Sequence, residues 1–250
     1  MNSLRIGCVK YLNARPLIEG WEGNVVLDHP SALCAQLARG DLDVALVSSF
    51  EFLRNPIYRI VDRVAIASNG PVYSVVVAYR GKFADVKEIA LDPAAQTSGN
   101  LLRCLLGQLN LTPRVTSSPS DESARLIIGD QAIRFRAEHG ADYQFWDLGE
   151  QWKKLLRLPF VYALWLIRPE VENSKAVADR LRALRDDNLR NIDSIIAREA
   201  EFSPEFCRRY YGEHLRFSFG DEEQRGLSRF AELCRKHELL PNADLVLDLV

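Results

Sequence analysis

Arg5-Ile6-Gly7-Cys8-Val9 is followed, after one lysine, by Tyr11-Leu12-Asn13-Ala14-Arg15-Pro16-Leu17. The first run is typical of a short buried strand, and Pro16 can open a helix because its ring presets a helical φ. A strand that ends beside Asn13 brings polar groups and free backbone N–H donors to the carboxyl edge of a sheet. Open α/β sheets bind ligands at that edge. The start of the chain therefore predicts a small-molecule site.

The remaining sequence alternates between strand-like and helix-like runs. Predicted strands cover 24–28, 43–47, 58–67, 72–79, 88–91, 114–116, 125–128 and 160–167. Predicted helices cover 32–39, 50–53, 99–109 and 131–138. The C-terminal region 174–240 is helical in pattern, with salt-bridge-rich faces over 174–199 and a second helix over 221–238. This order predicts an α/β protein with two βα lobes and a central cleft between them. We expect lobe 1 to comprise 1–77 plus 165–250, with the C-terminal helices, and lobe 2 to comprise 78–164.

Composition excludes several classes of protein. The formal net charge of −2 over 250 residues argues against a general nucleic-acid or membrane-surface binder. No apolar run approaches the roughly 20 residues of a membrane span, and no signal-peptide core precedes Ile6. The five cysteines are scattered without a CxxC pair, so we expect core packing rather than zinc or disulfides. Reduced thiols suit a cytoplasmic protein. The oligomeric state cannot be predicted.

Polar residues follow several predicted strands. The clusters are Asn13 with Arg15, Ser48 with Ser49, Ser68 with Gly70 and Ser74, Thr97 with Ser98, and Asp130. Hydroxyls, amides and helix N-termini suit carboxylate ligands, and an arginine could add a bidentate contact. Each cluster taken alone is more typical of helix capping. Asp130 also fits a cap, and Arg15 could instead pair with an acidic neighbour. Five clusters at equivalent strand ends favour one ligand site.

Other chemistry has little support. The segment Asp147-Leu148-Gly149-Glu150, between two tryptophans, predicts the start of a surface helix rather than a catalytic group. The sequence contains no nucleophile elbow, P-loop or metal motif. Ser48 and Ser49 have no base placed nearby in the sequence, so a hydrolase triad is weakly supported.

Several motifs, in this order, resemble the chorismate dehydratase family of the futalosine (alternative menaquinone) pathway over residues 5–165. They are the 11–17 segment already quoted, Asp43–Leu53 (DVALVSSFEFL), Ser68–Val75 (SNGPVYSV), Leu91-Asp92-Pro93 with Thr97-Ser98, Ile128–Ala132 (IGDQA), Trp146–Trp152 (WDLGEQW) and Leu158–Trp165 (LPFVYALW). The chain departs from the family pattern Ser-Arg-Thr-Ser-Val-Ala at Ala95–Asn100 (AQTSGN), and at Leu156-Arg157, where the family commonly has Thr-Gly. The first departure lies at an expected carboxylate contact.

The resemblance implies a type II periplasmic-binding-protein fold, no metal or organic cofactor, and conversion of chorismate to 3-[(1-carboxyvinyl)oxy]benzoate and water. It makes Asn13 the expected catalytic residue, able to hydrogen-bond the departing hydroxyl or the enolpyruvyl group. The substrate's own enolpyruvyl carboxylate would then take the proton. Thr97 and Ser98 would hold one carboxylate, and Ser68 or Ser49 the other. The expected substrate-binding residues are Arg15, Ser49, Ser68, Gly70, Ser74, Thr97, Ser98 and Asp130.

Two alternatives stay open at this point. One is the sister enzyme of the same pathway and fold, which makes 1,4-dihydroxy-6-naphthoate; its Ser-Pro-Cys-Pro-Asn-Asp type of motif is absent here. The other is a non-catalytic carboxylate-binding protein of the same fold.

Overall fold

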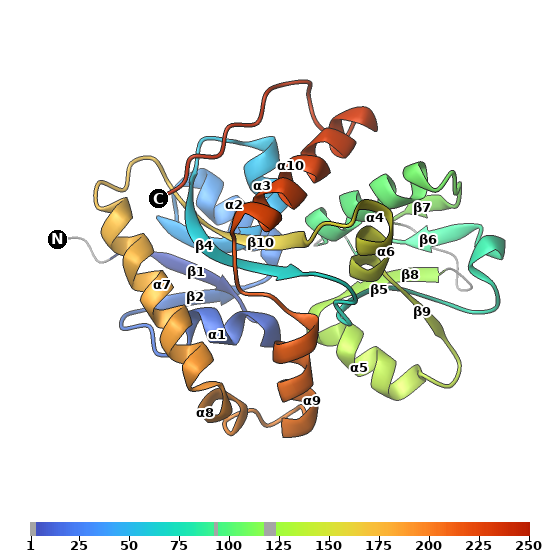
Figure 1. Ribbon diagram of the computed structural model, residues 1–250, viewed down its shortest axis with the longest axis horizontal. Helices are drawn as coiled ribbons and strands as arrows, with labels where there is room; N and C mark the ends of the chain where they lie inside the picture. The colour runs from blue at the N-terminus through green and yellow to red at the C-terminus, as the bar shows by residue number, and fades with distance from the viewer. Residues whose placement is uncertain (1–3, 93–94, 118–123) are drawn as a thin grey trace.

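The computed structural model describes residues 4–92, 95–117 and 124–250, and its strands form two five-stranded sheets side by side (Figure 1). The first sheet contains β1 (Ile6–Val9), β2 (Val25–Asp28), β3 (Val44–Ser48), β4 (Arg59–Ser68) and β10 (Phe160–Ile167). The second contains β5 (Val75–Tyr79), β6 (Glu88–Ala90), β7 (Arg114–Thr116), β8 (Ala124–Ile128) and β9 (Gln144–Asp147). The predicted two-lobed α/β architecture is therefore confirmed.

The two sheets share one topology. Their strand orders are β2-β1-β3-β10-β4 and β7-β6-β8-β5-β9. In each sheet the first three strands are parallel, and the fourth is antiparallel to both of its neighbours. That fourth strand enters from the other half of the chain, so the chain crosses between lobes at 69–74 and again at 157–159. Every residue of β10 is buried, as expected for a strand covered on both faces.

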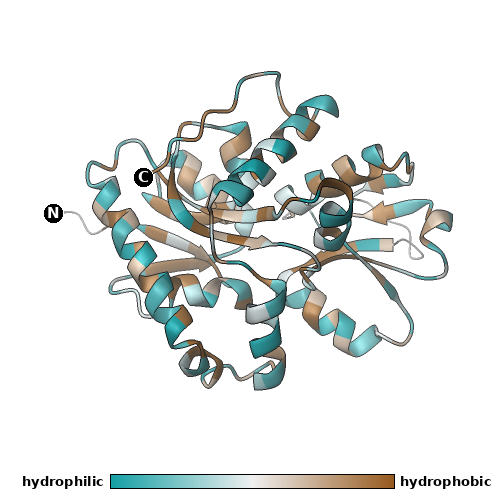
Figure 2. Ribbon diagram, in the orientation of Figure 1, coloured by the Kyte–Doolittle hydropathy of each residue, from teal (hydrophilic) through white to brown (hydrophobic). Residues whose placement is uncertain are grey.

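Helices pack on both sheets. In Figure 2 the strands are mainly hydrophobic, whereas the helices mix hydrophilic and hydrophobic residues. The α-helices are α1 (Arg15–Ile18), α2 (Pro30–Arg39), α3 (Ser49–Arg54), α4 (Gln96–Gln108), α5 (Gly129–His139), α6 (Leu148–Leu156), α7 (Ser174–Arg190), α8 (Ile192–Ile196), α9 (Pro204–Arg209) and α10 (Asp221–Lys236). Short 3₁₀ helices are η1 (Leu12–Ala14) and η2 (Phe83–Asp85), and η3 (Tyr210–His214) is a π-helix. No helix in the described residues is both long and apolar enough to cross a bilayer.

The C-terminal segment packs on both lobes. Helix α7 lies against α1 and β4 of the first lobe. Arg216 then exchanges two backbone hydrogen bonds with Ala67 of β4, at 2.9 and 2.7 Å. Helix α10 packs on β10 and reaches α4 of the second lobe, where the Sγ atoms of Cys104 and Cys234 lie 3.7 Å apart. The C-terminal third of the chain therefore braces the junction between the lobes.

Some sequence predictions differ from the structure. Strand β9 was not predicted, and β5 begins at Val75 rather than at residue 72. Helix α9 and the π-helix η3 lie within the region 174–240 that was predicted to be helical. Strand β5 begins late because the backbone N–H groups of Val72 and Tyr73 donate to the Asp147 carboxylate, at 3.0 and 2.8 Å, instead of to a neighbouring strand. A helix, α6, starts at the segment 147–150 as predicted, and Asp147 caps it by accepting from Glu150 N. Asp147 is buried, however, so the prediction that this start lies on the surface was wrong.

The expected boundary residues, 77/78 and 164/165, stay predictions. They fall inside β5, which pairs wholly within the second sheet, and inside β10, which pairs wholly within the first. The five cysteines are all unpaired and buried, which confirms their role as core residues. Pro93 of the quoted motif lies outside the described residues.

Candidate active site

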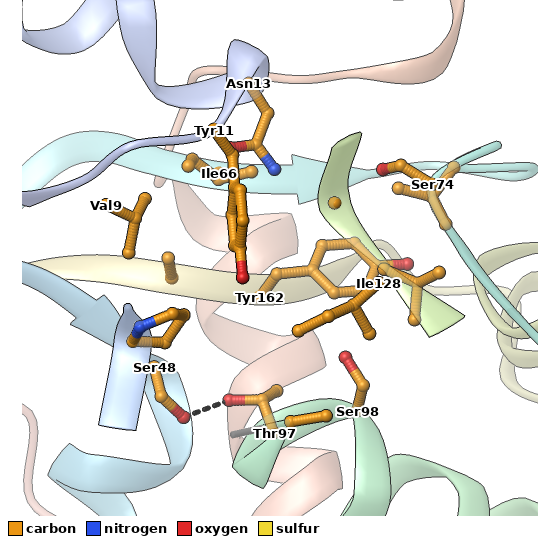
Figure 3. A pocket seen from close by; sticks show the side chains of 16 residues that line it. Val9, Tyr11, Asn13, Ser48, Ile66, Ser74, Thr97, Ser98, Ile128 and Tyr162 are labelled. Atoms are coloured by element: carbon orange, nitrogen blue, oxygen red, sulfur yellow. Dashed lines mark hydrogen bonds between the residues drawn. The ribbon is translucent and has the colours of Figure 1, made fainter. Parts of the chain in front are cut away.

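A cavity of about 70 Å³ lies between the two lobes, at the carboxyl ends of β1, β3 and β8 (Figure 3). Its walls come from both lobes and from the crossing segments. The lining residues are Val9, Tyr11, Asn13, Pro30, Ser48, Ile66, Val72, Ser74, Val75, Ala95, Thr97, Ser98, Ile128, Gly129, Tyr162 and Ala163. Four of the predicted site residues are among them: Asn13, Ser74, Thr97 and Ser98. The cavity thus has largely apolar walls with a few polar groups, the usual character of a small-molecule site.

Asn13 occupies the middle of η1, immediately after β1. Its Oδ1 atom is buried and has no hydrogen-bond partner among the described residues. A buried polar atom without a partner costs about 1–3 kcal/mol, so native proteins keep few of them and often use them for ligands. The Asn13 amide is therefore available to a ligand in the cavity.

Ser48 and Thr97 meet on the opposite side of the cavity, where their hydroxyls form a hydrogen bond between the lobes (Figure 3). Ser48 ends β3 of the first lobe, and Thr97 lies in the first turn of α4 in the second. Thr97 Oγ1 also accepts a hydrogen bond from Phe50 N at 3.3 Å. Ser98 follows Thr97 at the N-terminus of α4, where free backbone N–H groups and the helix dipole favour an anion.

Ser49 and Ser68 lie behind the cavity wall. Ser49 Oγ donates to Val161 O at 2.8 Å, which joins α3 to β10. Ser68 Oγ lies 3.1 Å from the Tyr162 hydroxyl and donates to Gly70 O at 3.1 Å. Burial raises the Tyr162 pKa well above its ordinary value, so this phenol stays neutral. Ser49, Ser68 and Gly70 therefore form hydrogen bonds that stabilise the segments behind the cavity, and they do not line the cavity themselves.

Asp130 connects the lobes at a second place. Its carboxylate accepts hydrogen bonds from Leu12 N, at 2.9 Å to Oδ1 and 3.2 Å to Oδ2, so it caps η1 of the other lobe instead of its own helix. Burial raises the Asp130 pKa to about 6, partly offset by the Leu12 hydrogen bond. Asp130 does not line the cavity, but it holds the segment that carries Asn13.

Gly129, the residue before Asp130, fits closely against an aromatic ring of the first lobe. Its φ is +61°, in the left-handed region, and a Cβ atom there would lie 3.0–3.1 Å from the Tyr11 ring. The Tyr11 side chain extends into the cavity (Figure 3). Burial and the nearby Asp92 and Asp130 charges raise the Tyr11 pKa, so its hydroxyl is also a neutral donor.

Arg15 points away from the cavity. Its guanidinium lies 2.5 Å from Glu199, whose side chain is only 2% exposed, in the segment between α8 and α9. Arg15 therefore pairs with an acidic residue, the alternative to ligand binding that the sequence allowed. This ion pair joins α1 to the C-terminal region. Among the described lining residues there is no Arg, Lys, His, Asp or Glu. The cavity therefore offers hydroxyls, an amide and helix N-termini, without a charged side chain.

The aromatic members of the site, Tyr11 and Tyr162, were not predicted from the sequence. Tyr11 lies within the first quoted motif, close to the candidate site residues Asn13 and Arg15. Tyr162 lies in an apolar strand, where alternation gives no sign that its ring faces a cavity. Strand-end polarity was the signal used, and it does not detect aromatic walls.

Solved structures of low sequence identity share this fold. The protein AF1704 from Archaeoglobus fulgidus superposes with a TM-score of 0.72 at 18% identity, covering 95% of this chain and 98% of that one. The periplasmic aliphatic sulphonate binding protein SsuA from Escherichia coli gives 0.64 at 14% identity, covering 96% and 94%. These similarities confirm the predicted periplasmic-binding-protein-like fold.

Sequence comparison adds a closer relationship. The chain is 28% identical to the chorismate dehydratase of Thermus thermophilus over 256 residues, covering 91% of this chain and 93% of the relative. The family model described as "Menaquinone biosynthesis" matches residues 4–236, nearly the whole chain. The chain belongs to this menaquinone biosynthesis family.

Proposed function

We propose that this protein dehydrates chorismate to 3-[(1-carboxyvinyl)oxy]benzoate. The observation that carries the proposal is the Asn13 side chain, whose amide oxygen has no hydrogen-bond partner among the described residues and which lines a cavity whose far side presents hydroxyls and the N-terminus of α4. The named activity of the Thermus thermophilus relative supports the choice of substrate. Chorismate carries two carboxylates and a hydroxyl, so it matches a cavity with anion donors and a free hydrogen-bond acceptor.

The substrate carboxylates would be held without arginine or lysine. Thr97, Ser98 and the first N–H groups of α4 bind one of them. Ser74 lies nearer Asn13 and, with the N-terminus of α5 at Gly129, binds the other. Ser74 thus takes the part expected of Ser49 or Ser68, which lie behind the wall.

The reaction breaks two bonds that join ring carbons of chorismate to their substituents. The C3–H bond breaks and its proton goes to the substrate's own enolpyruvyl carboxylate, because no described lining side chain is an obvious base. The C4–O bond breaks, the departing hydroxide takes that same proton from the enolpyruvyl carboxylate, and water leaves. The ring gains its third double bond and becomes aromatic. Since the product is so stable, the protein supplies mainly orientation, and Asn13 hydrogen-bonds the departing hydroxyl.

The test is incubation of the purified protein with chorismate, followed by chromatography and mass spectrometry. We expect chorismate to disappear and an aromatic diacid lighter by one water to accumulate, faster than in a heat-denatured control. Unchanged chorismate would overturn the proposal. Calorimetric binding of chorismate without turnover would instead indicate a carboxylate-binding protein.

We further infer that the reaction belongs to the futalosine route and takes place in the cytoplasm. The motif order over residues 5–165 supports the route. Five unpaired, buried thiols suit a reducing compartment.

A further inference from the structure

The crossing segment 69–74 brings Val72 and Ser74 to the wall of the cavity through a strained turn. The Ser74 N–H donates to Val72 O, two residues earlier, at 2.8 Å, and the φ of Tyr73 between them is +68°. This is a γ-turn with a positive central φ, a conformation that is rare and that bulky side chains seldom adopt. Such strain persists only where the surrounding structure holds it, and it is concentrated at functional sites. Neighbouring groups must therefore stabilise this turn.

The Asp147 carboxylate holds the turn from the start of α6. Its Oδ1 accepts from Val72 N at 3.0 Å and its Oδ2 from Tyr73 N at 2.8 Å, so each oxygen binds one N–H group of the turn. Oδ1 also accepts from Glu150 N at 3.1 Å, which caps α6. The Asp147 side chain is buried. This carboxylate therefore fastens the crossing segment to the first turn of a helix that follows the second sheet.

A second group, Arg136 of α5, also holds the turn. Its Nη1 atom donates to Tyr73 O at 2.8 Å, and its guanidinium carbon lies 4.1 Å from the centre of the Tyr73 ring. The guanidinium is also 3.9 Å from the Asp147 carboxylate. Phe206 of the C-terminal segment packs on the same ring, at a centroid distance of 5.2 Å. Both backbone polar groups of Tyr73 therefore have partners, and its ring contacts two further elements.

Gly149 lets the start of α6 approach the crossing segment closely. A Cβ atom at this position would lie 2.5 Å from Gly70 O, and 2.7 Å from both the Ser68 Oγ and the Tyr162 hydroxyl. A residue with a side chain would have to displace these groups. The segment 147–150, which the sequence predicts only as a helix start, thus lies directly behind the cavity wall.

Ser74 is fixed through three of its atoms. Its N–H belongs to the turn, its carbonyl accepts from Gly129 N at 2.8 Å, and its Oγ accepts from the Tyr210 hydroxyl at 2.6 Å. Because Oγ is the acceptor in that bond, its own proton is left for a ligand in the cavity that Ser74 lines. A shift of the turn would therefore move a substrate-binding hydroxyl.

We propose that Asp147 is a positioning residue, whose carboxylate holds the strained turn at Tyr73 and thereby places Ser74 against the substrate. This inference rests on the proposed function. It gives a role in the reaction to the Trp146–Trp152 motif, none of whose residues lines the cavity.

The test compares Asp147→Asn with Glu223→Gln. Asparagine keeps the shape but has one acceptor oxygen, so one N–H group of the turn loses its partner. Glu223 is also a buried carboxylate; it accepts from Gly220 N at 2.9 Å at the start of α10 and does not line the cavity. We expect kcat/KM for chorismate to fall by about 10–100-fold in Asp147→Asn, because a misplaced contact group costs up to this much. Glu223→Gln should stay near the wild-type value.

A double-variant cycle separates positioning from a general loss of structure. Once Ser74→Ala has removed the hydroxyl, Asp147→Asn should lower kcat/KM by less than about threefold more, because both changes act through the same contact. Combined with Thr97→Val, at the opposite side of the cavity, Asp147→Asn should keep its full cost. A merely structural role would lower kcat/KM by the same factor in the wild-type, Ser74→Ala and Thr97→Val backgrounds.

A second pair of variants covers the case in which Asp147→Asn does not fold. Arg136→Met removes the hydrogen bond to Tyr73 O, and Arg134→Met, on the same helix, removes an arginine that pairs with Glu201 at the surface. We expect kcat/KM to fall by about tenfold in Arg136→Met, the effect of one lost hydrogen bond from a charged group. Arg134→Met should have no such effect.

Equal kcat/KM in Asp147→Asn and Glu223→Gln would overturn the inference, and so would losses that multiply fully with Ser74→Ala. If Asp147→Asn does not fold, equal kcat/KM in Arg136→Met and its control has the same meaning. The wild-type protein, assayed alongside, separates the two proposals. Without wild-type turnover the proposed function fails, whereas normal wild-type turnover with an unaffected Asp147→Asn contradicts only the positioning role.

Discussion

The two polar ends of the cavity differ in whether their polar groups already have hydrogen-bond partners within the protein. At the Asn13 end, defined by Asn13 and Ser74, an amide oxygen has no partner in the described protein. At the Thr97 end, defined by Ser48, Thr97 and Ser98, the hydroxyls of Ser48 and Thr97 already bond each other across the lobes. An unsatisfied acceptor is ready for a ligand group, whereas a satisfied pair stabilises the closed arrangement.

This difference separates two tasks. The Thr97 end joins the lobes and offers a helix N-terminus, which suits the binding of a carboxylate. The Asn13 end offers an amide whose oxygen has no hydrogen-bond partner among the described residues, which suits a group that changes during the reaction. We therefore expect substitutions at the Asn13 end to affect turnover, and substitutions at the Thr97 end to affect binding.

The largest effect is expected for Asn13→Ala. Loss of the amide should lower kcat by about 10²–10⁴-fold, the usual range for a group that assists proton transfer. The fold should be kept, since the free oxygen contributes no internal bond. Steady-state assays and thermal unfolding check both points, with Asn55→Ala as the control for loss of a half-buried amide away from the cavity. Near-normal turnover in Asn13→Ala would remove the distinction between the ends.

Thr97→Val keeps the shape of the Thr97 end and removes its hydroxyl. We expect KM for chorismate to rise by about 10–100-fold with a smaller change in kcat, because a hydrogen bond to a charged group contributes roughly 1.5–3 kcal/mol. Thr112→Val, on the exposed loop after α4, is the control. A loss confined to kcat would contradict a binding role for this end.

Gly129→Ala tests the fit between the lobes beside the Asn13 end. The new Cβ would press on the Tyr11 ring, so we expect a several-fold loss of kcat/KM together with about 1–2 kcal/mol lower stability. Gly81→Ala carries a similar backbone cost at φ +72° with open space around it. Equal kcat/KM in the two variants would show that the Tyr11 contact is unimportant.

The last prediction concerns stability rather than turnover, at Asp130, the second connection between the lobes. Its folded pKa of about 6 lies above the ordinary value of 3.8, so its ionisation opposes folding. The stability that wild type gains from the neutral carboxyl is full below about pH 4 and is lost as pH rises through 6. Relative to Asp130→Asn, wild type should therefore lose about 1–3 kcal/mol of unfolding free energy between pH 4 and 7.

Denaturant unfolding at several pH values measures this difference. Asp142→Asn, at an exposed side chain, controls for the loss of a surface charge. A difference between wild type and Asp130→Asn that grows in favour of wild type as pH rises would contradict the assignment.

Much of the fold follows from local sequence patterns. The apolar run of β10 and the strand ends at Asn13 and Thr97 were predictable, because burial and turn chemistry are read along the chain. Strand β9 was missed because its polar flank resembles a helix start. Its last residue, Asp147, is buried where it accepts hydrogen bonds from backbone N–H groups of the distant crossing segment 69–74.

The site was predictable only in part, for a related reason. Asn13 and Arg15 lie two residues apart in one motif, yet one lines the cavity and the other pairs with Glu199, 184 residues later. Likewise, Tyr210 reaches Ser74 from 136 residues away. Which polar residue finds an internal partner depends on contacts between distant segments, and no local pattern contains that information.

The most direct test of the separation between the two ends is calorimetric titration of chorismate into Asn13→Ala. If the Thr97 end holds the substrate and the Asn13 end serves the reaction, the variant should bind chorismate within about tenfold of the wild-type KM while failing to convert it. Loss of binding together with turnover would contradict the account, as would conversion at a near-normal rate.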